Sequence, residues 1–229
     1  MIKAVLFDVG GTLVHLDRRF VVQTLNELGH SATIEDFLRA HAVAAREISR
    51  IMRSDEPGTD TTRWRAYGAK LMQEMNVGGE TLEKIGAAIM QRSRDGDLFS
   101  HVEDGTAEAL AELKASGLRL GIVSNADGRV ASFVEKAGLA DFFEVIIDSG
   151  NVGVEKPNPR IFEIACEAMK IKPEETVYVG DIYEIDVLGA RAAGIKAFLL
   201  HNGEKDPHWD ADVEVIPTLY ALRSTLYAE

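Results

Sequence analysis

Residues 3–13 read Lys3-Ala4-Val5-Leu6-Phe7-Asp8-Val9-Gly10-Gly11-Thr12-Leu13. The short run over residues 3–7 is apolar, does not alternate with polar residues, and ends abruptly in an acid that two glycines soon follow. An unbroken apolar run is typical of a strand buried on both faces, as the strands of parallel sheets are. We therefore expect a buried parallel strand that carries Asp8 at its carboxyl end.

Similar apolar runs recur along the rest of the chain and alternate with helical patterns. The predicted strands after the first are residues 118–123, 145–147, 176–179 and 196–200, with a short edge strand at 213–215. The helical patterns that separate them lie at residues 106–116, 128–137, 159–170 and 184–193. Strand and helix alternation of this kind predicts an α/β fold with a doubly wound, Rossmann-like parallel sheet.

One segment departs from this alternation. Between residues 17 and 94 the apolar residues recur at helical spacing only, and Thr33 with Asp36 resembles a capping box that starts one of the helices. The segment follows the first strand, so it interrupts the α/β pattern. We expect residues 1–15 and 97–229 to form the α/β core and residues 16–96 to form an inserted helical cap.

Charge and composition restrict the partners of the 229-residue chain. It has 37 acidic and 25 basic residues and a formal net charge of -12. This balance argues against nucleic acid and anionic membranes as partners, because both attract a surplus of Lys and Arg. It leaves room for a small phosphorylated substrate, which needs only a local positive pocket. The cap's apolar stripes are compatible with a monomer or a homodimer.

Neither a disulfide nor a membrane span is expected. The chain has one cysteine, Cys166, so no disulfide can form within it, and a reducing compartment is the simplest interpretation. No apolar run is long enough to span a membrane. We therefore expect a cytoplasmic protein.

Polar side chains close three of the predicted strands, and a lysine lies in the loop after another strand. Asp8, Ser124 with Asn125, and Asp181 each close a strand, and Lys156 follows the third strand just before a helix. Ligands of open parallel sheets bind beyond the carboxyl ends of the strands. A single acid at such a place is commonly a helix cap. Capping does not easily explain all four together.

These residues resemble the motifs of the haloacid dehalogenase superfamily. Phe7–Leu13 resembles its first motif, Gly121–Asn125 its second, Lys156–Phe162 its third, and Gly180–Asp186, continued to Gly194, its fourth. Their order and spacing are similar to those of the subgroup with a helical cap between motifs one and two. The resemblance covers the whole core, whereas the cap agrees only in position and helical texture.

The resemblance implies a Mg²⁺-dependent hydrolase with Asp8 as nucleophile, forming an aspartyl-phosphate. It implies metal ligands from the Asp8 side chain, the Gly10 carbonyl and the Asp181 side chain. Asp186 would act at or just outside the metal shell. Oxygen ligands of this kind suit a hard cation such as Mg²⁺.

The resemblance also implies how the phosphoryl group is held. Lys156 would supply a second cation that touches both the nucleophilic carboxylate and the phosphoryl group. Ser124 would donate its hydroxyl to a phosphoryl oxygen, and Asn125 would add an amide. Backbone N–H groups near Gly11 and Thr12 would approach the phosphate closely.

Gly10 departs from the pattern of family phosphatases, which usually carry a second Asp at this position. That residue protonates the leaving group, an effect typically worth ~10²- to 10⁴-fold. His15, Asp17 and Glu184 are candidates to replace it, although His15 is more simply a linker residue that enters the cap.

Three functions follow from this departure. The first is a phosphatase of a small phosphorylated metabolite. The second is a weakly active or inactive member that binds a phosphorylated ligand or has a regulatory role. The third is a 2-haloacid dehalogenase, against which the acidic pair Asp181 and Asp186 argues, because a halide leaving group needs no Mg²⁺.

Overall fold

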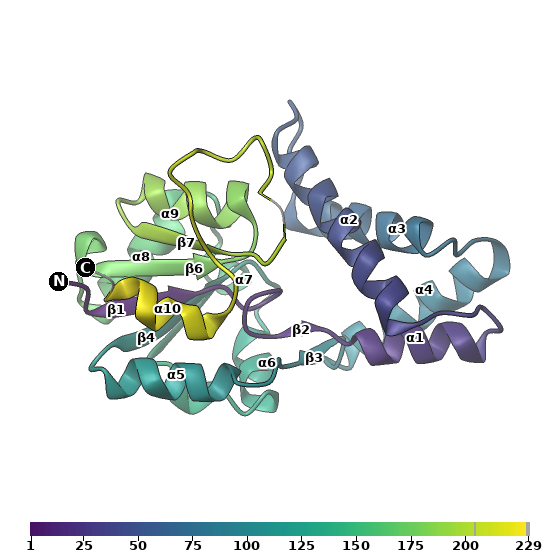
Figure 1. Cartoon of the computed structure of the whole chain (residues 1–229), viewed down its shortest axis with the longest axis horizontal. Coiled ribbons are helices and arrows are strands. Elements are labelled where there is room, and N and C mark those ends of the chain that lie inside the picture. Colours follow the sequence, from purple (N-terminus) through teal and green to yellow (C-terminus); the bar gives the residue numbers. More distant parts are fainter. Residues whose placement is uncertain (204, 228–229) are drawn as a thin grey trace. The chain divides into compact units, whose positions relative to one another are not determined.

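The computed structural model describes residues 1–203 and 205–227, so residue 204 and the last two residues of the predicted core lie outside it. The chain forms two compact units, one made of Met1–His15 with the segment that starts at Val102, the other of Leu16–His101 (Figure 1). The second unit ends at His101 rather than at residue 96. Its last residues, Phe99–His101, form a short strand, β3, in a two-stranded sheet with β2 (His15–Leu16).

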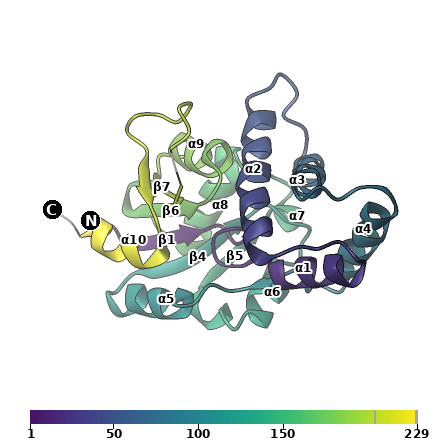
Figure 2. The ribbon, with the colours of Figure 1, turned by 45° about the vertical axis from the view of Figure 1, so that its right-hand side comes forward.

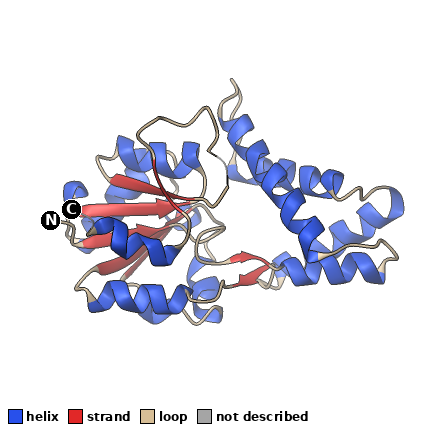
Figure 3. Ribbon diagram, viewed as in Figure 1, coloured by secondary structure: helices blue, strands red, loops and turns tan. Residues whose placement is uncertain are grey.

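The first unit is built on a six-stranded sheet in the order β5-β4-β1-β6-β7-β8. All of its neighbouring strands pair in parallel (Figure 3). The strands are β1 (Ala4–Phe7), β4 (Arg119–Ser124), β5 (Val145–Asp148), β6 (Thr176–Gly180), β7 (Lys196–Leu200) and β8 (Glu214–Ile216). Each corresponds to a predicted apolar run, which confirms the expected α/β fold with a doubly wound parallel sheet.

Helices flank this sheet. On one side α5 (Thr106–Ala115) packs against β4 and against α10 (Leu219–Leu226), and α6 (Val130–Lys136) packs against β5. On the other side α8 (Pro159–Met169) packs against β4, β5 and α9 (Leu188–Ala192). The core under α8 is closely packed, because Phe162 of α8 meets Tyr178 of β6 edge to face at a centroid distance of 4.9 Å.

The strand order defines where a ligand binds. From β1 the chain builds β4 and β5 on one side, then crosses back and adds β6, β7 and β8 on the other. The order therefore reverses beside β1, and ligands of open parallel sheets bind beyond the carboxyl strand ends at such a point, here those of β1, β4 and β6. The first, second and fourth motifs lie at these three strand ends.

The second unit consists of four helices. They are α1 (Arg18–Glu27), α2 (Ile34–Met52), α3 (Asp60–Glu74) and α4 (Gly79–Arg94). Helices α2 and α3 pack along each other, and α1 contacts both α2 and α4 (Figure 2). The expected capping box is confirmed: Thr33 accepts from the Asp36 N–H, and Asp36 accepts from the Thr33 N–H.

Several short elements were not expected from the sequence. They are the pair β2 and β3, the single-turn helix α7 (Ser149–Val152), and two 3₁₀ turns, Ala140–Phe142 and Pro173–Glu175. The predicted helix at residues 184–193 begins as a π-turn, Tyr183–Val187, and becomes α-helical only at Leu188. Within the described residues, no helix has both the length and the apolar character that a membrane crossing requires.

Candidate active site

Asp8 is held at the end of β1 by backbone and side-chain contacts. Its N–H donates to the Val179 carbonyl of β6 (2.9 Å), which continues the parallel ladder one residue past the strand. Its Oδ1 accepts from the Ser124 hydroxyl (3.0 Å) and from Lys156 Nζ (2.7 Å). The carboxylate is therefore buried and fixed by two donors from separate parts of the chain.

Lys156 is a buried cation at the centre of the site. Its Nζ lies 2.7 Å from Asp8 Oδ1, 2.7 Å from Asp186 Oδ1 and 2.8 Å from the Tyr178 hydroxyl. Burial acts against the charged form, but the negative charges of Asp186 and Asp8 outweigh it and raise the pKa of Lys156 above its ordinary value. The ammonium group therefore stays protonated at neutral pH.

Asp8, Asp181 and Asp186 bring their carboxylate oxygens together, each within 4.8 Å of the others. Burial raises the pKa of Asp8, with Lys156 opposing the shift. Burial, then the charges of Asp8 and Asp186, hold the pKa of Asp181 well above its ordinary value. Three acids thus lie together beside one ammonium group, which pairs with Asp8 and Asp186, and a divalent cation would balance the remaining negative charge.

The three acids differ in how many hydrogen bonds their carboxylate oxygens accept. Asp186 Oδ2 accepts from the Ile182 N–H (2.9 Å), and its Oδ1 accepts from Lys156. Asp181 Oδ1, by contrast, is buried and has no hydrogen-bond partner among the described residues. A buried carboxylate oxygen without a donor is costly unless a cation meets it, so the donor set fits a metal at Asp8 and Asp181, with Asp186 beside it.

Two glycines make room for these acids. Gly11 has φ +86°, and a Cβ there would lie 2.3 Å from Asp181 Oδ2. A Cβ on Gly180 would lie 2.3 Å from Asp186 Cγ. Both positions therefore require glycine because a carboxylate occupies the space that a side chain would take.

The turn after Asp8 differs from the expectation for Gly11 and Thr12. The Gly11 N–H donates to the Val14 carbonyl (3.0 Å) and the Thr12 N–H to the Val9 carbonyl (3.3 Å). These two donors close the turn, so they do not point at a phosphate in this conformation. The Thr12 hydroxyl is buried and has no hydrogen-bond partner among the described residues.

Asn125 joins the second and third motifs. Its amide nitrogen donates to the Lys156 carbonyl (3.0 Å), and its amide oxygen accepts from the Lys156 N–H (2.7 Å). The side chain therefore fixes the backbone of the lysine loop, where the sequence had suggested a contact with the phosphoryl group. One amide hydrogen remains for another acceptor.

Residues at the end of β5 hold the loop over residues 125–130 through hydrogen bonds to its backbone. Asp148 accepts from the N–H groups of Gly128 (3.0 Å), Val130 (3.0 Å) and Gly150 (2.9 Å), and the Ser149 hydroxyl exchanges hydrogen bonds with the backbone of Ala126. Asp148 was not singled out from the sequence. An acid that ends a buried strand is the pattern that marked Asp8 and Asp181, and it would have found Asp148 as well.

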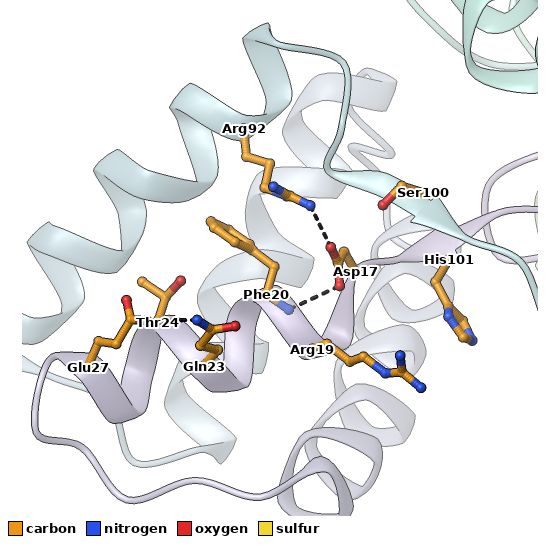
Figure 4. Close-up of a pocket in the computed structure, with 9 residues that line it drawn as sticks. All are labelled: Asp17, Arg19, Phe20, Gln23, Thr24, Glu27, Arg92, Ser100 and His101. Atoms are coloured by element: carbon orange, nitrogen blue, oxygen red, sulfur yellow. Dashed lines mark hydrogen bonds and ion pairs between the residues drawn. The ribbon is translucent and has the colours of Figure 1, made fainter. Parts of the chain in front are cut away.

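The candidates for the missing acid lie in three different places. Asp17 is the N-cap of α1: its Oδ1 accepts from the Phe20 N–H (3.0 Å), and its Oδ2 pairs with Arg92 of α4 at 2.7 Å (Figure 4). Asp17 thus has a structural task within the second unit. His15 lies in β2, and Glu184 is buried in the π-turn that also carries Asp186.

Tyr178 was missed because the run over residues 176–179 reads as an ordinary apolar strand. Its hydroxyl is within hydrogen-bonding distance of Lys156 Nζ, Asp186 Oδ1 (3.1 Å) and the Val123 carbonyl (2.9 Å). Strand periodicity places Tyr178 on the same face as Gly180, where Asp186 packs. The sequence did offer one sign of this role: Tyr178 stands two residues before Gly180, so its side chain points to the face of the sheet where Asp186 packs.

Comparisons of the sequence with known proteins identify a family and two relatives. The sequence matches the haloacid dehalogenase-like hydrolase family over residues 2–194. It is 29% identical to a glyceraldehyde 3-phosphate phosphatase of Methanothermobacter thermautotrophicus (99% of this chain, 100% of that protein). It is 31% identical to a phosphoserine phosphatase of Thermus thermophilus (93% and 95%).

A solved structure agrees with these sequence matches. The crystal structure of a HAD phosphatase from Thermococcus onnurineus superposes with a TM-score of 0.64 at 27% sequence identity, covering 100% of this chain and 99% of that one. The sequence matches and the structural match both extend over the residues of both units.

Proposed function

Because this chain belongs to the haloacid dehalogenase-like hydrolase family, we propose that it is a phosphatase of a small phosphorylated metabolite, with Asp8 as the nucleophile. The observation that carries the proposal is the Asp8 carboxylate, which Ser124 and Lys156 hold at a strand end beside Asp181. The names of the two curated relatives support a phosphoric monoester as the substrate class.

In the proposed reaction an Asp8 carboxylate oxygen attacks phosphorus as the bond to the leaving oxygen breaks. Water then hydrolyses the aspartyl-phosphate, which restores Asp8 and releases inorganic phosphate. The two donors on Oδ1 restrict rotation of the carboxylate, so the attacking oxygen is positioned before substrate arrives. Ser124, at the end of β4, supplies the hydroxyl that donates to this carboxylate.

The residues fit a bound Mg²⁺, for which we propose the Asp8 and Asp181 carboxylates and the Gly10 carbonyl as ligands. Asp181 Oδ1 offers an oxygen with no donor among the described residues, and both Asp186 oxygens already accept hydrogen bonds. We therefore place Asp186 just outside the metal ligands, where it orients Lys156. When bound, the cation would offset the repulsion between the acids and an anionic substrate.

Lys156 contributes mainly as a fixed countercharge. An ammonium group has three N–H donors, and the contacts to Asp8, Asp186 and Tyr178 account for all three. A direct hydrogen bond to the phosphoryl group would require one of these contacts to be exchanged. Without such an exchange, the positive charge of Lys156 beside Asp8 would still stabilise the charge that develops on the phosphoryl group, because the site is buried.

Gly10 limits which substrates react well. Without an acid at this position, the leaving oxygen departs most readily when it is stable as an anion, as in aryl phosphates. We therefore propose a substrate with a good leaving group, or a proton supplied by Glu184 of the π-turn. The same absence favours the second function, a weakly active member that binds a phosphorylated ligand.

Phosphatase assays with variants of Asp8 test the proposal. Wild-type protein should hydrolyse p-nitrophenyl phosphate when Mg²⁺ is present and lose activity in EDTA, and Asp8→Asn should be inactive. Asp104→Asn, an exposed acid of the same unit, is the matched control and should retain wild-type activity. Turnover that survives Asp8→Asn would exclude Asp8 as nucleophile, and chloride release from a 2-haloacid would indicate the dehalogenase.

Restoring the missing acid separates the two remaining functions. Gly10→Asp should raise kcat for alkyl phosphates by ~10²- to 10⁴-fold and change aryl phosphate turnover much less, because only poor leaving groups need a proton. No gain for alkyl substrates, with phosphate still bound by the variant, would favour the binding function.

We also propose a cytoplasmic location. Cys166 is a buried free thiol on α8, and burial raises its pKa, so it is a packing residue that needs no oxidising compartment. A monomer or a homodimer stays a prediction.

A further inference from the structure

Tyr178 is a fully buried phenol placed among charged groups. Its hydroxyl contacts Lys156 Nζ (2.8 Å), Asp186 Oδ1 (3.1 Å) and the carbonyl of Val123 (2.9 Å), the residue just before Ser124. Burial, together with the negative charges of Asp186 and Asp8, raises its pKa well above the ordinary value, so the hydroxyl keeps its proton. One side chain thus reaches the second, third and fourth motifs.

Counting donors and acceptors defines the role of this hydroxyl. A neutral tyrosine has one O–H donor and accepts through its lone pairs. Lys156 has only donors, so the phenol oxygen accepts from Nζ and directs its own hydrogen to Val123 or to Asp186. The hydroxyl is therefore the neutral third partner of an ammonium whose other two partners, Asp8 and Asp186, are both charged.

The ring that carries the hydroxyl is itself held firmly. It lies on β6 opposite Leu6 of β1 and meets the ring of Phe162 at a centroid distance of 4.9 Å. A ring packed in this way cannot turn without disturbing the core. The position of the hydroxyl is therefore set by the sheet rather than by the flexible side chain of the lysine.

We propose that Tyr178 is a positioning residue of the active site, which fixes the Lys156 ammonium so that it bridges Asp8 and Asp186. Lysine carries its charge on a flexible four-carbon stem. Two acidic partners alone leave the ammonium free to pivot about the line between them, and the third contact removes that freedom. Asp8, which shares a hydrogen bond with the same ammonium, is thereby held in the geometry that attack requires.

This inference rests on the proposed phosphatase function for its kinetic test. Tyr178→Phe removes the hydroxyl and keeps the ring against Phe162. We expect kcat for p-nitrophenyl phosphate to fall by roughly 10- to 100-fold, the usual effect of losing a partner that orients a reacting group, with KM within about twofold of wild type. Tyr220→Phe is the control, because it removes an exposed phenol of the same unit that lies on α10, outside the four motifs. It should leave kcat unchanged.

A second readout does not depend on turnover. A buried ammonium with three hydrogen bonds exchanges its protons slowly, so ¹H–¹⁵N spectra of the metal-free protein should show a Lys156 NH₃⁺ resonance, assigned by its loss in Lys156→Met. In Tyr178→Phe this resonance should broaden or disappear, and in Tyr220→Phe it should remain. A purely structural role for Tyr178 would lower stability and leave the resonance of the folded protein unchanged.

The outcomes separate this inference from the proposed function. If wild-type protein lacks phosphatase activity, the proposed function fails, and the ammonium resonance still decides the role of Tyr178. An unchanged kcat together with an unchanged resonance in Tyr178→Phe would overturn the inference. If that variant does not fold, wild-type protein decides: the Lys156 ammonium protons must show NOEs to the Tyr178 ring, and their absence would also overturn it.

Discussion

At the scale of single residues, the site depends on small side chains beside large charges. Gly11 combines a left-handed backbone with a Cβ position that falls on Asp181. The sequence suggested that a glycine here lets a phosphate approach. The structure gives a second reason, which is that the acid of another strand occupies the space. Motif patterns alone did not reveal this, because the clash is between residues distant in the chain.

A pair of alanine substitutions separates the two effects at Gly11. Gly11→Ala and Gly117→Ala share the same φ of +86°, but nothing lies within 4 Å of a Cβ at Gly117. We expect each to lose about 1–2 kcal/mol of unfolding free energy from the backbone strain. Only Gly11→Ala should also weaken Mg²⁺ binding, measured by calorimetry, because Asp181 must move. Equal Mg²⁺ affinity in the two variants would contradict this explanation.

At the scale of elements, apolar runs predicted the strands well, because parallel strands buried on both faces are apolar along their whole length. The π-turn at Tyr183–Val187 was read as part of an ordinary helix, since one extra residue in a turn leaves the apolar spacing almost unchanged. β2 and β3 are too short for any period to appear. Asn125 was assigned to the substrate because the sequence cannot show that its amide is used by the Lys156 backbone.

The pairing of α2 with α3 leads to a prediction about pH. Nδ1 of His41, on α2, is hydrogen-bonded to the Tyr67 hydroxyl of α3 at 2.7 Å, and the His41 ring stacks on Phe37. Burial, then the charge of Arg18, holds the pKa of His41 below its ordinary value. Below pH ~6.5 the unfolded chain therefore binds more protons than the folded chain, so the free energy of unfolding falls as pH falls toward the lower, folded-state pKa.

Replacing His41 should remove this dependence. In His41→Gln the decline in unfolding free energy below pH ~6.5 should be shallower than in wild type by up to about 1.4 kcal/mol per pH unit. Urea titrations monitored by Trp64 fluorescence at several pH values would measure it, because Trp64 packs against Tyr67 in the same unit. Parallel curves for the two proteins would show that His41 does not titrate differently on folding.

At the scale of the whole molecule, we expect stability to depend on Mg²⁺, because three acids lie together beside one ammonium group. A ligand that binds only the folded state stabilises it by about 2.7 kcal/mol when its concentration is about 100 times Kd. We expect wild-type Tm to rise with Mg²⁺. Asp181→Asn should unfold at a higher temperature than wild type in EDTA, because it removes an acid that is buried against the charges of Asp8 and Asp186.

Thermal unfolding of the same variant with Mg²⁺ completes the comparison. Asp181→Asn should show little or no rise in Tm, whereas Asp104→Asn, whose side chain is exposed, should behave like wild type both in EDTA and with Mg²⁺. A Mg²⁺-dependent rise in Asp181→Asn equal to that of wild type would mean that the cation binds elsewhere.

The position of β1 in the middle of the sheet has a consequence for how the protein is made. Ala4 pairs with Arg119 on one side and with Thr176 on the other, so among the described strands β1 alone joins β5-β4 to β6-β7-β8. β1 precedes both β4 and β6 in the chain, so it cannot be enclosed on both sides until β6 has been synthesised. During translation β1 can pair with β4 first, but the edge that β6 covers stays open until residues 176–180 have been made.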